Sequence, residues 1–224
     1  MVATKLSDLN VIFEILQNMF TGIVQGIANI QTIHTGNNFK TLTIKFPKNG
    51  LTNIQKGASI AINGTCLTVT HHDAENNLAS FDVIQESLSV TNLGTLKAND
   101  SVNFERAAKF GDEIGGHLMS GHIHICTKIK RITRTEDNCS IYLETPDEFK
   151  RYLLPKGFAG LNGCSLTLGE VNDETFSVHL IPETLSMTTF GQCTEGELIN
   201  LEVDSQTQSI VDTVTRVLKE TKKI

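Results

Sequence analysis

The chain has 224 residues, 39% of them hydrophobic, so it is long enough for one large or two smaller domains with packed cores. It lacks the run of about 18 to 20 consecutive apolar residues that a membrane span requires. Its formal net charge is −6, whereas nucleic-acid binding requires a surface rich in Lys and Arg. We therefore expect neither a membrane nor nucleic acid as a partner.

The N-terminal residues 1–18 contain Lys5, Asp8 and Glu14, and they lack the basic start and apolar middle of a secretion signal. The five cysteines are odd in number and form no Cys-x-x-Cys pair, which argues against a disulfide framework and a cysteine-based zinc site. We therefore expect a cytoplasmic protein with reduced thiols.

Half-buried strands are predicted next, because hydrophobic and polar residues alternate. Leu42, Ile44 and Phe46 alternate with polar residues, and Leu67 and Val69 do the same. Asn, Gly and Asp interrupt these runs at intervals typical of a small antiparallel barrel or sandwich. Such interruptions occur at 48–50, 63–64, 76–77 and 99–100.

The chain contains this pattern twice. NGTCLTV at 63–69 returns as NGCSLTL at 162–168, a shift of 162 − 63 = 99 residues. Four further blocks recur in the same order with shifts of 97 to 100, namely 20–24 with 119–123, 56–57 with 156–157, 86–91 with 183–188 and 102–105 with 199–202. Two copies of about 95 residues do not suggest a solenoid. The repeat predicts tandem β-barrels.

Helices are predicted at two places in the second half. Residues 147–153 follow a proline and begin with acidic residues, which favours a short helix. After the second copy, Asp204 or Ser205 is a plausible N-cap for an amphipathic helix. Its apolar face, formed by Ile210, Val211, Val214, Val217 and Leu218, could pack on a barrel or on another subunit.

Cys66 is a candidate reactive group, because strand alternation turns its side chain away from Leu67 and Val69 and so toward a ligand. A small buried hydrophobe is the more common use of a free cysteine, and a nucleophilic role requires a lowered pKa. His117, His122 and His124 are possible metal ligands, but the pattern lacks a further ligand and supporting carboxylates in register. We expect no metal.

Equivalent positions of the two copies differ at three chemically important places. These pairs are Ile23 and His122, Cys66 and Ser165, and Asp82 and His179. Each exchange changes the capacity for proton transfer or nucleophilic attack, so we expect the two copies to have different tasks. Other pairs are kept and suggest shared binding or barrel-building positions, namely Gly22 and Gly121, Thr68 and Thr167, Lys56 and Lys156, and Glu86 and Glu183.

Together these segments resemble the riboflavin synthase family from about Met19 to Leu218. The motifs are MFTGIV at 19–24, NGTCLTVT at 63–70, ERAAK at 105–109, GDEIGGHLMSGH at 111–122 and HLIPETL at 179–185. The resemblance implies a mostly β fold with two tandem six-stranded antiparallel Greek-key barrels, over 19–115 and 116–204. Residues 205–224 would form a C-terminal oligomerisation helix, and residues 1–18 would be an extension outside the family match.

The resemblance also implies a reaction. Two molecules of 6,7-dimethyl-8-ribityllumazine would give riboflavin and 5-amino-6-(D-ribitylamino)uracil, the last step of riboflavin biosynthesis, by transfer of a four-carbon unit. No cofactor would be needed, because the lumazine is electrophilic at C7 and its C7 methyl group is acidic. Family members are similar homotrimers in which the first barrel of one subunit faces the second barrel of another, with two substrates per active site. Lumazine synthase is a further expected partner.

The family's functional positions carry over to both copies. Cys66, His122, His117 and Ser165 would be catalytic, with Cys66 or water adding to C7 of one substrate while His122, helped by His117, moves protons at the methyl group of the other. Substrate contacts are implied at Gly22, Ile23, Val24, Cys66, Leu67, Thr68, Asp82, Val83, Ile84, Gln85, Glu86, Ser87, Gly121, His122, Ile123, Lys156, Ser165, Leu166, Thr167, His179, Leu180, Ile181, Pro182, Glu183 and Thr184.

A non-catalytic alternative has the same fold. The lumazine or flavin antenna proteins of luminous bacteria resemble this double barrel but only hold the chromophore. They are weak at the catalytic positions of the first barrel, whereas this chain keeps Cys66, His117 and His122, which favours the enzyme. A tandem flavin reductase or oligonucleotide-binding barrel is disfavoured, because neither a Gly-rich βαβ unit nor a basic face is visible.

Overall fold

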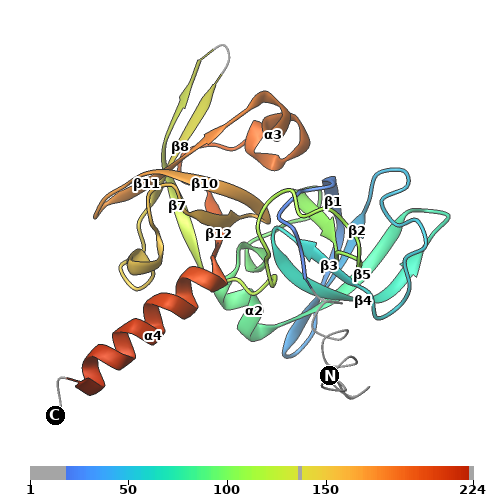
Figure 1. Cartoon of the computed structure of the whole chain (residues 1–224). Helices are drawn as coiled ribbons and strands as arrows, with labels where there is room; N and C mark the ends of the chain where they lie inside the picture. Colours follow the sequence, from blue (N-terminus) through green and yellow to red (C-terminus); the bar gives the residue numbers. More distant parts are fainter. Residues whose placement is uncertain (1–18, 136–137, 222–224) are drawn as a thin grey trace.

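The computed structural model describes residues 19–135 and 138–221, which form two closed six-stranded barrels and a C-terminal helix (Figure 1). The first barrel has the order β1-β2-β5-β4-β3-β6 and the second the order β10-β11-β8-β7-β12-β9, with all neighbouring strands antiparallel. Read from β7, the second order repeats the first, which confirms the predicted tandem barrels.

The strand bounds follow the repeat. The first barrel contains β1 (Gly26–Thr35), β2 (Phe39–Lys45), β3 (Ser59–Ile62), β4 (Thr65–Asp73), β5 (Leu78–Ile84) and β6 (Ser101–Arg106). The second contains β7 (Ile125–Arg134), β8 (Cys139–Glu144), β9 (Phe158–Leu161), β10 (Cys164–Val171), β11 (Thr175–Leu180) and β12 (Leu198–Val203).

The interior of each barrel is filled by its own side chains. Leu42 and Ile44 of β2 and Val69 of β4 are fully buried, as the alternating pattern predicted. They pack with Phe81 in the core of the first barrel, and an equivalent cluster around Phe176 fills the second. A small barrel packed in this way has no room for a ligand inside, so a binding site must use the outer faces of the strands.

The Asn-Gly motifs form tight turns that also join the barrels. Asn63 and Asn162 have positive φ angles, as do the glycines that follow them, which suits a two-residue hairpin turn. A Cβ atom added to Gly64 would lie 2.6 Å from the backbone nitrogen of Gly163. The two turns therefore pack backbone to backbone at the centre of the molecule.

Buried asparagines hold this contact in a reciprocal pattern. The side-chain amide of Asn103 donates to the carbonyl of Asn162 at 2.9 Å, and that of Asn200 donates to the carbonyl of Asn63 at 2.8 Å. All four residues are buried. Because equivalent asparagines make this contact in both directions, the barrels are related by an approximate two-fold axis.

Short helices connect the strands at equivalent places. They are α2 (Gln85–Val90) and η1 (Asn92–Gly94) in the first copy, and α3 (Pro182–Met187) and η3 (Thr189–Gly191) in the second; η2 (Lys150–Tyr152), between β8 and β9, is an additional helix that corresponds to a turn in the first copy. The helix predicted over 147–153 is shorter than expected: residues 147–149 form a turn and only η2 is helical. Tyr152 and Leu153 are buried in the second barrel, and anchoring them there ends the helix after one turn.

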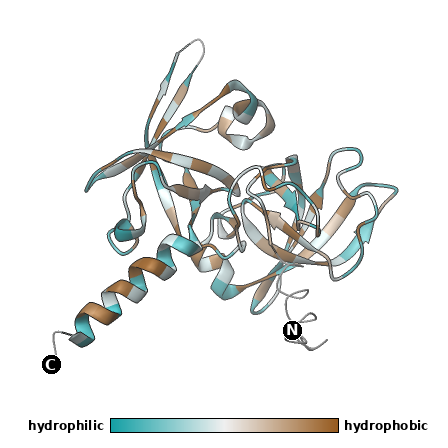
Figure 2. Cartoon of the chain, viewed as in Figure 1, coloured by the Kyte–Doolittle hydropathy of each residue, from teal (hydrophilic) through white to brown (hydrophobic). Residues whose placement is uncertain are grey.

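The C-terminal helix α4 (Ser205–Thr221) projects away from the barrels (Figure 1). Asp204 is its N-cap, because its Oδ2 atom accepts from the backbone of Thr207 at 2.9 Å. Val211 packs against the second barrel. The remaining apolar residues, Ile210, Val214, Val217 and Leu218, are each more than half exposed and give the helix its hydrophobic colouring in Figure 2.

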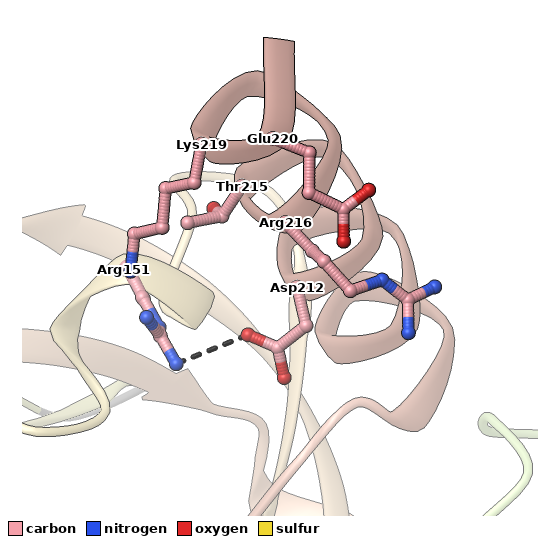
Figure 3. Close-up of a pocket in the computed structure, with 6 residues that line it drawn as sticks. All are labelled: Arg151, Asp212, Thr215, Arg216, Lys219 and Glu220. Carbon is pink, nitrogen blue, oxygen red and sulfur yellow. Dashed lines mark ion pairs between the residues drawn. The ribbon is translucent and has the colours of Figure 1, made fainter. Parts of the chain in front are cut away.

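A polar face attaches α4 to the second barrel. Asp212 forms a 3.0 Å ion pair with Arg151 and accepts a 2.6 Å hydrogen bond from the hydroxyl of Tyr152. Arg151 and Asp212 border a pocket of about 370 Å³ that Arg216 and Lys219 also line (Figure 3). Within 19–135 and 138–221, no helix is both long and apolar enough to cross a membrane.

Candidate active site

The repeated strands β4 and β10 present equivalent outer faces. Cys66 on β4 and Ser165 on β10 are half-buried, and Thr68 and Thr167 follow on the same faces and are exposed. The neighbouring strands β3 and β9 carry different residues beside these positions. Cys66 and Thr68 pair with Ala61 and Ser59 of β3, whereas Ser165 and Thr167 pair with Gly160 and Phe158 of β9. We call these two surfaces the Cys66 face and the Ser165 face.

Each face continues onto a neighbouring strand and a short helix. Asp82 on β5 accepts a 2.7 Å hydrogen bond from the hydroxyl of Thr41. At the equivalent place His179 on β11 has its Nδ1 atom 2.8 Å from the hydroxyl of Ser140. Both Asp82 and His179 are exposed. The sequence difference between the copies is therefore at the surface, where a ligand could meet an acceptor on one barrel and an imidazole on the other.

The loops before β1 and β7 are exchanged between the copies. Phe20 and Met119 pair across the centre through backbone hydrogen bonds of 2.8 and 2.9 Å. Beyond this pair, the carbonyl of Gly22 accepts from Ser165, and the carbonyl of Gly121 accepts from Cys66, both at 2.8 Å. Each loop therefore lies against the other copy's barrel.

This exchange changes the expected grouping of the site residues. Reading each copy separately would group Ile23 with Cys66 and His122 with Ser165. The structure instead brings Gly121, the residue before His122, to the Cys66 face, and Gly22, the residue before Ile23, to the Ser165 face. The repeat could not reveal this, because the exchange depends on pairing between the barrels rather than on any pattern within one copy.

Glycines are required where the loops approach the strands. A Cβ atom on Gly121 would lie 2.6 Å from Cβ of Cys66, and one on Gly22 would lie 2.5 Å from Cβ of Ser165. Both glycines also have positive φ angles, of 77° and 73°. A side chain at either place would push the loop away from the face that it lines.

His117 belongs to the Ser165 face. Its Nδ1 atom is 2.6 Å from Oγ of Ser165, and its ring stacks on Phe158 with centroids 5.5 Å apart. Burial lowers the pKa of His117, and the negative charge of Asp204 only partly opposes this. The imidazole is therefore neutral near pH 7. His117 and His122 are thus associated with different faces of one chain, although the sequence suggested that they act together.

The Cys66 thiol is not activated as a nucleophile. Burial raises the pKa of Cys66, and a hydrogen bond with Ser59 opposes the effect only in part. At neutral pH the group is a thiol rather than a thiolate. The lowered pKa that a cysteine nucleophile requires is therefore missing. Sequence reasoning overlooked Ser59 and its counterpart Phe158, although a shift of 99 residues aligns them.

The lysines at 56 and 156 are not equivalent, which corrects the sequence alignment. Gly57 donates to the carbonyl of Val69, and Lys156 donates to that of Leu168, so the structural partner of Lys156 is Gly57. The φ angle is positive at both, 90° and 67°. The two copies are therefore related here by a shift of 99 residues. Aligning the Lys-Gly pairs at 56–57 and 156–157 gave a shift of 100, which is wrong by one position.

The expected substrate contacts fall into two groups. Val24, Leu67, Val83, Leu166 and Leu180 are buried among the core residues, so only their backbone can reach a ligand. The others have half-buried or exposed side chains, apart from the buried glycines; the exposed ones include Ile84, Gln85, Glu86, Ile181, Pro182 and Glu183. Within the described residues, no group of three or more His, Cys, Asp and Glu side chains could hold a metal ion.

Comparison with known proteins gives consistent results. A family model described as a lumazine binding domain matches residues 21–107 and again 120–204. The riboflavin synthase of Escherichia coli (strain K12) is 51% identical over 201 residues, covering 89% of this chain and 93% of that protein. The riboflavin synthase of Buchnera aphidicola subsp. Schizaphis graminum is 42% identical over 202 residues, covering 90% of this chain and 96% of that protein.

Solved structures of LumP share the fold. LumP complexed with riboflavin has a TM-score of 0.78 at 27% identity, and the match covers 83% of this chain and 100% of LumP. LumP complexed with 6,7-dimethyl-8-(1'-D-ribityl) lumazine has a TM-score of 0.75 at 26% identity, covering 83% of this chain and 99% of LumP. The identity to these two synthases, 51% and 42%, is thus well above the 26% and 27% to LumP.

Proposed function

The chain belongs to the riboflavin synthase family, and on that premise we propose how its two barrels share the reaction. It is an enzyme that dismutates two molecules of 6,7-dimethyl-8-ribityllumazine into riboflavin and 5-amino-6-(D-ribitylamino)uracil. One lumazine donates a four-carbon unit and the other accepts it. The observation that carries our proposal is the pair of similar but chemically unequal outer faces, with Cys66 on one barrel and Ser165 with His117 on the other.

We assign one lumazine to each face. The packed barrel interiors leave only the outer surfaces, where exposed apolar side chains such as Ile84 and Ile181 can cover a flat ring. Backbone groups of the repeated strands and the hydroxyls of Thr68 and Thr167 would read the ring edge. The ribityl chain would contact exposed polar groups, with Asp82 on one face and His179 on the other.

The chemical roles follow from the grouping of the side chains. At the Cys66 face, Cys66 or a water molecule adds to C7 of the bound lumazine, and the raised pKa of the thiol favours water. His122 is the acid-base group there. At the Ser165 face, the neutral imidazole of His117 acts with Ser165 on the C7 methyl group of the second lumazine. Acid-base help of this kind is worth about 100-fold to 10,000-fold in rate.

We further propose that the active enzyme is a homotrimer in which the Cys66 face of one subunit meets the Ser165 face of another. The uncovered apolar side of α4 supports this, because its opposite, polar side is already held by Arg151. Holding two like molecules together in a fixed orientation can itself lower the activation free energy by about 7 kcal/mol or more. A cytoplasmic location and an association with lumazine synthase are carried over from the family as part of this proposal.

The decisive experiment is direct. Purified protein is incubated with 6,7-dimethyl-8-ribityllumazine, and the growth of riboflavin absorbance is followed together with loss of the lumazine band. We expect one riboflavin for every two lumazines consumed. Tight binding without any new flavin would instead indicate an antenna protein like LumP.

A further inference from the structure

Two buried glutamates hold the exchanged loops. Oε1 of Glu202 accepts hydrogen bonds from the backbone and hydroxyl of Ser120 at 2.7 and 2.8 Å, and Oε2 accepts from the backbone of Gly121 at 3.1 Å. Glu105 makes the same three contacts with Thr21 and Gly22, at 2.7, 2.8 and 3.0 Å. Each glutamate is only 3% exposed.

These carboxylates have no cation to balance them. The ion pairs within 19–135 and 138–221 involve other residues, and both glutamates are surrounded by N–H and O–H groups. Burial raises the pKa of Glu105 to about 7 and also raises the pKa of Glu202. An unpaired carboxylate in the interior is costly, so its presence in both copies calls for a function beyond packing.

A carboxyl group satisfies this arrangement, whereas an amide does not. Three donors converge on two oxygen atoms, and both oxygens must accept. A glutamine has the same shape, but its amide nitrogen would point N–H groups at the backbone N–H of Ser120 or Gly121. Glutamine at either position should therefore fill the same space as glutamate, but it should lose the hydrogen bond between one of its side-chain atoms and the loop.

A relay connects Glu202 to His122. The hydroxyl of Ser120, which donates to Glu202, accepts a 3.2 Å hydrogen bond from the backbone N–H of His122. The carbonyl of Gly121 accepts from Cys66 on the opposite side. The loop is therefore held from β12 through its N–H groups and from β4 through its carbonyl, directly before the point where the His122 side chain leaves it.

The same relay in the first copy ends on a residue without acid-base chemistry. The hydroxyl of Thr21 donates to Glu105 and accepts from the backbone N–H of Ile23 at 3.3 Å. Ile23 is half exposed and contributes apolar surface at the Ser165 face. The two glutamates thus support loops of equal geometry that carry different side chains. A substitution of one glutamate is therefore a matched control for the same substitution of the other.

We propose that Glu202 is a positioning residue for the reaction, fixing the loop that aims the His122 imidazole at the lumazine on the Cys66 face, whereas Glu105 fixes the apolar contact that Ile23 makes on the Ser165 face. The kinetic consequences of this inference rest on the proposed function. Loss of Glu202 then reduces turnover, and loss of Glu105 weakens substrate binding.

The test compares Glu202→Gln with Glu105→Gln in the full-length protein. Rates of riboflavin formation give kcat and KM, and titration of the lumazine fluorescence gives Kd. We expect Glu202→Gln to lower kcat by about tenfold or more with Kd changed less than about threefold. Glu105→Gln should instead raise KM and Kd by about threefold to tenfold, with the smaller effect on kcat. Equal changes of kcat and KM in the two variants would overturn the proposal.

A spectroscopic signal separates this inference from the proposed function. The imidazole resonances of His122, assigned by comparison with His122→Gln, should shift in Glu202→Gln and stay unchanged in Glu105→Gln, whether or not flavin is formed. Failure of the wild-type protein to form riboflavin, with this NMR difference present, would reject the reaction and leave the positioning intact. Unchanged His122 resonances in Glu202→Gln would reject the positioning.

Ser120→Ala and Thr21→Ala provide a milder pair if a glutamine variant does not fold. Each removes only the hydroxyl of the relay and leaves two backbone hydrogen bonds on the carboxylate. Ser120→Ala should lower kcat by about threefold or more and shift the His122 resonances, whereas Thr21→Ala should leave those resonances in place. Wild-type kcat in Ser120→Ala would contradict the relay.

Discussion

The backbone N–H of Cys66 donates a 2.8 Å hydrogen bond to the carbonyl of Gly121, which joins a strand of the first barrel to a loop of the second copy. The equivalent bond runs from Ser165 to Gly22. Through these two bonds each barrel completes its surface with residues of the other copy. The duplicated chain is therefore one structural unit, and a change in either loop should alter the surface of the opposite barrel.

Gly121→Ala should destabilise the protein and displace this loop. The new Cβ atom would lie 2.6 Å from Cβ of Cys66, and the φ angle of 77° is unfavourable for alanine. We expect a loss of about 2 kcal/mol or more in the free energy of unfolding, measured by urea denaturation. Gly57→Ala is the control, since its φ is also positive but a Cβ atom would meet nothing within 4 Å. Equal losses in the two variants would show that the contact with Cys66 is unimportant.

Cys66→Ser should retain much of the activity, because burial keeps the Cys66 side chain a neutral thiol that bonds to Ser59. A serine hydroxyl can make the same hydrogen bond, so we expect kcat within about tenfold of wild type, and a larger loss in Cys66→Ala. The rates are compared at saturating lumazine. A loss of about 1000-fold or more in Cys66→Ser would identify Cys66 as the nucleophile and reject water in that role.

Much of the fold followed from the sequence, because it depends on local patterns. The alternation of hydrophobic and polar residues around Leu42 and Ile44 predicted which side chains are buried. The Asn-Gly pairs at 63–64 and 162–163 predicted the turns. The error at Lys156 has a physical origin: what is repeated there is a left-handed backbone position, which Gly57 fills in the first copy. Residue identity alone does not record backbone conformation.

The candidate site was less predictable, because its contacts are long-range. The 2.6 Å approach of His117 to Ser165 spans 48 residues, and the contact between Glu202 and Ser120 spans 82. Neither distance is encoded in a local pattern. A signal for the glutamates was nevertheless present, since the repeated blocks at 102–105 and 199–202 both end in Glu at the edge of a hydrophobic strand.

Acidification should destabilise the protein partly through His117. Burial lowers its pKa from the ordinary value of 6.5, so the unfolded chain takes up the proton first as the pH falls. The stability is fully present above pH 6.5 and is lost as the pH falls from there toward the folded-state pKa. His117→Gln should reduce this dependence, measured as the free energy of unfolding between pH 7.5 and about 5.

His124 contributes with the same sign, because burial lowers its pKa as well, so some pH dependence should persist in His117→Gln. His34→Gln is the control, because it removes an exposed imidazole near the end of β1, away from the barrel interior. An identical profile in wild type and His117→Gln would mean that folding does not change the pKa of His117, and a profile altered in the opposite direction would mean that folding raises it.

Val214→Asp should separate the subunits. Val214 lies on the uncovered apolar side of α4 with Ile210 and Val217, while Asp212 on the opposite side is paired with Arg151 (Figure 3). A buried valine contributes about 1.5 kcal/mol or more, and a charge in its place would add a desolvation cost in each copy of the interface. Sedimentation should therefore detect monomers for Val214→Asp and trimers for wild type.

The kinetics of Val214→Asp distinguish an active site formed between two subunits from subunits that are joined only through α4. If the Cys66 face of one subunit must meet the Ser165 face of another, monomers should still bind lumazine on separate faces but form riboflavin at least about 100-fold more slowly, because the two substrates are no longer held together. Ser209→Asp places the same charge on an exposed position of α4 outside the apolar side and should remain trimeric and active. Full activity in monomeric Val214→Asp would mean that both substrates meet within one chain, and the arrangement of faces between subunits would then be wrong.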